Sequence, residues 1–276
     1  MIRIKPEYLL YPLLTPICIW AGADTTFINP EYYGPLFLSM AMFLAFIGSF
    51  ILNEIIHNRF IGAQAENVAD KYAVTARTAL FISILLLAIS LIIAYLINLY
   101  VFASLFILSG LILLSGFIEK KVPLLKYLLL LLIAGIVVIS GGLAVEPKLN
   151  MSLPGPVLPA LFTMIFLLMI EITADIKNIA QDLQNNIKTL PVIIGIPKSL
   201  IMVIIVFILF ILMTLFSVFS SWFGASFKII TIYIIDMPTL VLLILIWGNP
   251  NRRTLSTGMV VFTIGWFLSI MALMLD

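Results

Sequence analysis

Long apolar runs recur along the whole chain and constrain its fold more than any other feature. Of the 276 residues, 63% are hydrophobic and only 10% are charged, a profile that soluble domains do not have. A helix that crosses a bilayer needs about 20 mainly apolar residues. We therefore predict an all-α, multi-pass membrane protein that forms a single transmembrane domain over residues 1–276. Nine apolar segments are expected, at residues 8–24, 33–57, 74–97, 99–118, 124–144, 155–179, 199–219, 226–247 and 254–275.

The basic residues predict how the chain is oriented in the membrane. If the N-terminus is cytoplasmic, all 15 Lys and Arg residues except Lys148 and Lys228 fall on the cytoplasmic side. This asymmetry follows the positive-inside rule and supports an odd number of spans. The N-terminus also lacks the small-residue cleavage site of a signal peptide, so we expect the first run to be a retained helix.

Several kinds of site and partner are excluded by composition. The chain has one cysteine, Cys18, and one histidine, His57. It therefore has neither a disulfide framework nor a metal site built from several cysteines or histidines. The net charge of +2 is too small to indicate nucleic acid as a partner.

A row of polar side chains ends the sixth apolar segment. Glu171, Asp175, Asn178 and Asp182 are spaced i, i+4, i+7 and i+11, which places them on one face of a helix. Acids on one face repel each other unless a cation lies between them, and ionisable groups near a membrane segment are usually functional. Oxygen ligands of this kind suit Mg²⁺. We therefore predict Mg²⁺ as a cofactor, with a solvated helix end as the alternative.

More charged residues lie in the loops that the predicted orientation places on the same, cytoplasmic side. Asn53 and Glu54 lie at the end of the second segment and Arg59 lies just after it; Lys120 follows the fourth segment, and Lys188 follows the sixth. Carboxylates that hold Mg²⁺ beside lysines and arginines form a site for a phosphorylated anion. At a membrane surface that anion is a lipid phosphate or diphosphate. Mg²⁺ and lysine stabilise the negative charge that develops when an allylic diphosphate leaves.

The polar row and the residues after it resemble the second aspartate-rich motif of the UbiA superfamily of intramembrane prenyltransferases. That motif reads approximately E-I-x-x-D-I-x-D-x-x-G-D, followed by Thr or Ser, Leu and Pro. Asn178 replaces an aspartate and Gln181 replaces a glycine. The residues that match the motif are Glu171, Ile172, Asp175, Ile176, Asp182, Thr189, Leu190 and Pro191. The form of the motif is similar to the branch with digeranylgeranylglyceryl phosphate synthase, chlorophyll synthase and menaquinone-type enzymes.

The first motif departs from the family pattern, which is N-D-x-x-D-x-x-x-D. The chain keeps Asn53 but has Glu54 in place of the first aspartate. His57 and Ile61 replace the other two aspartates. Imidazole is a poor ligand for Mg²⁺, so a metal at this motif would be held mainly by Glu54.

The resemblance implies a UbiA-like helical bundle around a central cavity. It also implies transfer of a polyprenyl group, such as geranylgeranyl, from its diphosphate to a lipid or aromatic acceptor. The preferred acceptor is geranylgeranylglyceryl phosphate, in ether-lipid synthesis. The implied roles are catalysis for Asp175, Asp182, Lys120 and Lys188; substrate binding for Asn53, Arg59, Lys120 and Lys188; and Mg²⁺ binding for Glu54, Asp175, Asn178 and Asp182.

Two other functions stay open at this point. The altered first motif also fits a protein that binds a prenyl lipid without transferring it. A small-solute transporter would need half-helices or an internal repeat around a midplane site, yet the polar groups cluster at one face and only one acid, Asp236, lies near the middle of a segment. Asp236 is expected to face the bundle interior and to pair with a polar group of another helix. Gly141 and Gly142 predict close helix packing.

Overall fold

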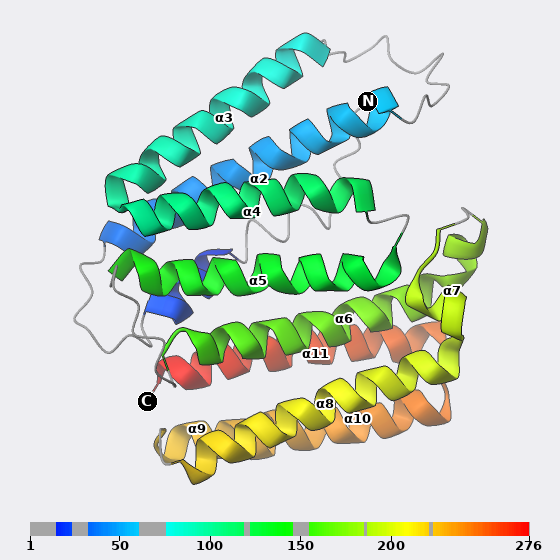
Figure 1. Cartoon of the computed structure of the whole chain (residues 1–276). Coiled ribbons are helices and arrows are strands. Elements are labelled where there is room, and N and C mark those ends of the chain that lie inside the picture. Colours follow the sequence, from blue (N-terminus) through cyan, green and yellow to red (C-terminus); the bar gives the residue numbers. More distant parts are fainter. Residues whose placement is uncertain are drawn as a thin grey trace. The chain divides into compact units, whose positions relative to one another are not determined.

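The computed structural model describes residues 15–23, 33–60, 76–118, 122–145, 155–184, 187–220 and 223–275. All regular elements in these ranges are helices (Figure 1), so the all-α prediction is confirmed. In the described ranges, seven helices are long and apolar enough to cross a membrane, and Leu99–Ser115 is a shorter apolar helix. The count of nine stays a prediction, because part of the first expected segment lies outside the described residues.

The described residues form two compact units. The first unit falls within Met1–Ile118 and Ile136–Met151, and the second within Glu119–Gly135 and Ser152–Asp276. Helix α5 (Pro123–Val145) therefore contributes its first half to the second unit and its second half to the first.

In the first unit, α2 (Tyr33–Phe60) packs against α3 (Ala76–Ile97) and α4 (Leu99–Ile118). Asn98 separates α3 from α4: its Oδ1 accepts a hydrogen bond from the backbone N–H of Val101 at 2.8 Å. This is the bond by which an asparagine caps a helix N-terminus. The Asn98 side-chain amide also donates to the carbonyl oxygen of Leu143 in α5 at 2.8 Å, which ties α5 to the start of α4.

Glycines bring the helix at residues 15–23 and the second half of α5 into backbone contact. A Cβ atom on Gly141 would lie 2.0 Å from the carbonyl oxygen of Ile19, and one on Gly22 would lie 1.9 Å from that of Val138. Small residues let membrane helices approach this closely. The predicted packing role is therefore confirmed for Gly141.

In the second unit, α6 (Val157–Gln184) packs against α8 (Ile196–Phe219) and α11 (Arg252–Met274). Phe162 and Phe166 of α6 meet Phe210 of α8 edge to face, with ring centroids 5.2 and 4.7 Å apart. On α11, the indole N–H of Trp266 donates to Thr163 Oγ1 at 3.2 Å. Such aromatic contacts add stability beyond the area they bury, and they hold the helix that carries the polar row.

The eighth expected segment is built from α9 (Ala225–Ile229), the π-helical stretch η1 (Ile230–Asp236) and α10 (Met237–Gly248). Pro238 is the second residue after η1, in the first turn of α10. A proline has no N–H to donate within a helix. Asp236 is buried and accepts a hydrogen bond from Thr214 Oγ1 of α8 at 3.2 Å. The expected pairing of Asp236 with another helix is therefore confirmed.

A short helix, α7 (Leu190–Ile194), connects α6 to α8. Pro191 lies in its first turn, where a missing N–H costs little. Gly195 follows with φ of 85°, a conformation that favours glycine. This turn starts α8 directly after α7.

Candidate functional site

Glu171 and Asp175 lie one helical turn apart in the second half of α6, and both contact the same ammonium group. Lys126 Nζ, from the first turn of α5, lies 3.0 Å from Asp175 Oδ1 and 3.1 Å from Asp175 Oδ2. It also lies 3.3 Å from Glu171 Oε2. The structure thus brings a cation to the two carboxylates, as their mutual repulsion requires. All three residues belong to the second unit.

Tyr127, the next residue of α5, fixes the orientation of the Asp175 carboxylate. Its hydroxyl donates to Asp175 Oδ2 at 2.5 Å, and the Tyr127 residue is only 5% exposed. Hydrogen bonds to ionised acceptors are short and strong.

We expect Tyr127→Phe to loosen the Asp175 carboxylate and to lower about 10-fold an activity that depends on this cluster, while the protein stays folded. The substitution removes one hydrogen bond to a charged group, which contributes roughly 1.5–3 kcal/mol, and it leaves the ring in place. Tyr233→Phe is the matched control, because Tyr233 is exposed on η1. Initial rates of product formation check the prediction, and equal rates for the two variants would contradict it.

Further along α6, the polar row makes a separate contact. Asp182 is half-buried, and its Oδ2 accepts a hydrogen bond from Thr189 Oγ1 at 3.1 Å. Thr189 is buried, whereas Asn178 and Lys188 are exposed. The structure therefore joins the row to the Thr189–Pro191 sequence but holds Asp182 outside the contacts of Lys126.

The first motif lies in the other unit, at the end of α2. Asn53 is half-buried, and its side-chain amide makes a long contact of 3.5 Å to the carbonyl oxygen of Ile112 in α4. The backbones of Glu54 and Arg59 belong to α2, but their side chains lie outside the described residues, as does all of Lys120. The site roles of these four residues stay predictions.

The carboxylates of Glu171 and Asp175 fit a metal ion whose remaining ligands are water or substrate oxygens. Among the described residues, no three carboxylate, imidazole or thiol groups gather into one metal-binding cluster. Glu171 and Asp175 do present oxygens to one position, where Lys126 Nζ lies. Mg²⁺ is commonly held by one or two carboxylates, with water and substrate phosphates completing its shell. The pair therefore fits Mg²⁺ that is shared with a phosphorylated ligand.

Lys126 and Tyr127 are the site residues that sequence reasoning missed. From the sequence, Lys126 is only one of the cytoplasmic basic residues, and Lys120 takes the role of the lysine after the fourth segment. A signal was nevertheless present, since Lys126 is charged and lies inside the apolar run that starts at Pro123. A charge in such a place needs a partner. Tyr127 carries no comparable signal.

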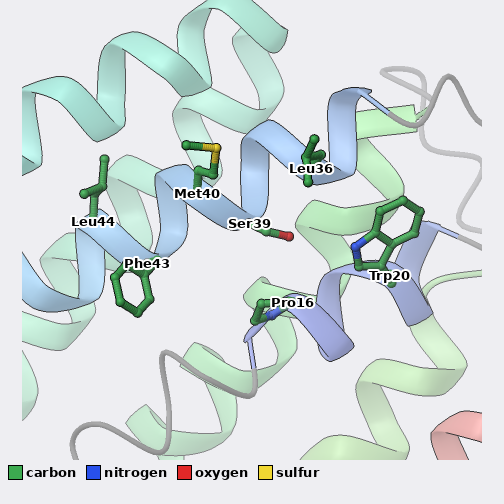
Figure 2. A pocket seen from close by; sticks show the side chains of 7 residues that line it. All are labelled: Pro16, Trp20, Leu36, Ser39, Met40, Phe43 and Leu44. Carbon is green, nitrogen blue, oxygen red and sulfur yellow. The ribbon is translucent and has the colours of Figure 1, made fainter.

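A pocket in the first unit contains none of the predicted site residues. The residues that line it come from the helix at residues 15–23 and from α2 (Figure 2), and all but Ser39 have apolar or largely apolar side chains. The Ser39 hydroxyl donates within its own helix, to the carbonyl oxygen of Pro35 at 2.8 Å. The described lining is therefore predominantly apolar. The lining residues are Pro16, Trp20, Leu36, Ser39, Met40, Phe43 and Leu44.

Comparison with known proteins places the chain in a family. The profile described as UbiA prenyltransferase family matches residues 10–256, while no curated protein matches the chain at a significant level. A structure described as digeranylgeranylglyceryl phosphate synthase in membranes has a TM-score of 0.76 and 18% identity, over 98% of this chain and 94% of that one. The apo structure of a UbiA homolog from Aeropyrum pernix K1 has a TM-score of 0.67 and 16% identity, over 96% of this chain and 98% of that one. Identities this low establish the fold alone, but the profile covers most of the chain. The chain therefore belongs to the UbiA prenyltransferase family.

Proposed function

We propose that the protein is an Mg²⁺-dependent intramembrane prenyltransferase that moves a polyprenyl group, such as geranylgeranyl, from its diphosphate to a lipid or aromatic acceptor. Family membership and the seven apolar spans of the described residues make it an integral membrane protein of a prenyltransferase family. The observation that carries the proposal is the contact of Lys126 with Glu171 and Asp175. An ammonium beside two carboxylates is suited to holding a metal ion together with a diphosphate.

The proposed reaction breaks the allylic C–O bond, and its electron pair stays on the diphosphate. Mg²⁺, when bound, would neutralise the charge that develops on the leaving group. The allylic cation is captured by an acceptor hydroxyl or aromatic carbon, which then loses its proton. Tyr127 holds the Asp175 carboxylate in place. The residues proposed to hold metal are Asp175, Glu171, Asn178 and Asp182 at the second motif and Asn53 and Glu54 at the first. The residues proposed to contact phosphate oxygens are Lys126, Lys120, Lys188 and Arg59.

Geranylgeranylglyceryl phosphate is the proposed acceptor. It is supported by the form of the second motif and by the fold shared with a digeranylgeranylglyceryl phosphate synthase. We further propose that the chain acts as one domain over residues 1–276, with the N-terminus and the site on the cytoplasmic side. This orientation is supported by the distribution of Lys and Arg residues.

The direct test uses the purified protein in lipid nanodiscs with radiolabelled geranylgeranyl diphosphate and a panel of acceptors that includes geranylgeranylglyceryl phosphate. We expect a labelled lipid product that forms with Mg²⁺ and does not form with EDTA. The product identifies the acceptor. Tight binding of the diphosphate with no release would instead favour a prenyl-lipid-binding protein, a function to which the altered first motif points.

A further inference from the structure

Lys126 lies where a metal ion would neutralise the second motif. Its ammonium contacts both oxygens of Asp175 and one oxygen of Glu171, at 3.0 to 3.3 Å. The side chains of Lys126, Glu171 and Asp175 are 16%, 18% and 10% exposed, respectively. The solvent therefore screens these contacts less than it screens ion pairs at an open surface.

A metal ion that binds these carboxylates alone has to displace the ammonium. Displacement would break the contacts of the lysine ammonium with both carboxylates in a mostly buried place, which is unfavourable. A metal ion that binds together with a diphosphate removes this obstacle, because the phosphate oxygens become new acceptors for the ammonium. The two carboxylates by themselves also supply few ligands, and Mg²⁺ commonly completes its shell with substrate phosphate.

We propose that Lys126 is an internal counter-ion of the second motif, and that it makes the binding of metal and diphosphate interdependent. Its ammonium stays on Asp175 and Glu171 until a diphosphate is present and then moves to the phosphate oxygens. This inference rests on the proposed function, since it takes a diphosphate as the ligand of the site. Because coupling between two ligands is reciprocal, the diphosphate raises the affinity for metal by the same factor as the metal raises the affinity for diphosphate.

The first measurement is a titration with Mn²⁺ alone, in which electron paramagnetic resonance measures the concentration of the free ion. The full chain is studied in phosphocholine nanodiscs as wild type, Lys126→Gln and Lys198→Gln. Lys198 is exposed on α8 and is the control for loss of one basic residue. We expect Lys126→Gln to bind Mn²⁺ about 10-fold more tightly than wild type, within the usual range of coupling factors, and Lys198→Gln to match wild type.

The second measurement is the binding of radiolabelled inorganic pyrophosphate in the presence of Mg²⁺. We expect Lys126→Gln to bind it about 10-fold more weakly than wild type, because the ammonium is one of its ligands. The two effects of Lys126→Gln thus have opposite signs. A merely structural role would weaken both kinds of binding together.

The outcomes separate this inference from the proposed function. In one outcome, wild type binds pyrophosphate with Mg²⁺, but Lys126→Gln binds Mn²⁺ no more tightly than wild type. This outcome overturns the inference and leaves the proposed function standing. Wild type that binds no pyrophosphate at saturating Mg²⁺ overturns both. If Lys126→Gln does not fold, Lys126→Arg takes its place. A guanidinium pairs bidentately with a carboxylate, so this variant should bind Mn²⁺ alone more weakly than wild type, and equal or tighter binding overturns the inference.

Discussion

Replacing Asp175 with asparagine is expected to lower the rate of prenyl transfer about 100- to 1,000-fold, the usual effect of removing one group that stabilises charge in a transition state. The amide is nearly the same size as the carboxylate and can still accept a hydrogen bond from Tyr127. It carries no negative charge, however, and turns an N–H₂ group or a neutral oxygen toward Lys126. A metal site at this position thus loses its most buried anionic ligand, while the packing of α6 is preserved.

The same substitution elsewhere in the second unit provides a matched control. Asp236 is also a buried aspartate, but it contacts Thr214 and takes no part in the proposed site. We expect Asp236→Asn to keep the wild-type rate. Initial rates and thermal unfolding of the two variants are compared in nanodiscs. A normal rate for Asp175→Asn would refute the proposed metal role, and equal losses in both variants would indicate a general effect of changing a buried acid.

Replacing Gly141 with alanine is expected to destabilise the first unit by about 1–3 kcal/mol. The added Cβ would lie 2.0 Å from a backbone oxygen, and also near the carbonyl carbon and Cα of the same residue, Ile19. Backbone atoms cannot swing aside as the end of a flexible side chain can. The helix at residues 15–23 and α5 must therefore move apart, which lowers the unfolding temperature by roughly 2–10 °C.

Gly110→Ala is the control for this packing effect. Gly110 is exposed on α4, and a Cβ atom there would meet no atom within 4 Å. Alanine is favoured over glycine in a helix by about 0.5–1 kcal/mol, so this variant should be as stable as wild type or more so. Unfolding followed by tryptophan fluorescence in detergent distinguishes the two. Equal stability of Gly141→Ala and Gly110→Ala would show that the helices do not meet at Gly141.

The helical segments could be predicted from the sequence because the bilayer imposes their length and composition. The expected segment at 155–179, for example, lies within α6 (Val157–Gln184) apart from its first two residues. The segment at 226–247 is a continuous span from Ala225 to Gly248, but its π-helical stretch was not expected. A π-helix depends on local hydrogen-bond geometry around Pro238 and Asp236, and hydropathy does not report that geometry.

Half of the candidate site could also be predicted from the sequence. The spacing of Glu171 and Asp175 places both on one helix face whatever surrounds the helix, and their repulsion requires a cation. The roles of Lys126 and Tyr127 could not be predicted in this way, because these residues are 49 and 48 residues from Asp175 along the chain. Lys120, which the sequence favoured, lies only six residues before Lys126, so a one-dimensional pattern could not choose between these lysines.

The sequence by itself determined that the chain is an all-α membrane protein, that it resembles the UbiA superfamily, and that an acidic row lies on one face of its sixth apolar segment. These properties follow from local periodicity and from the energetics of apolar and charged groups in a bilayer. Only the tertiary structure decided which cation neutralises the acids, which hydroxyl orients Asp175, and which glycines let helices touch. Each of these is a contact between residues distant in the chain, and such contacts exist only once packing has brought the helices together.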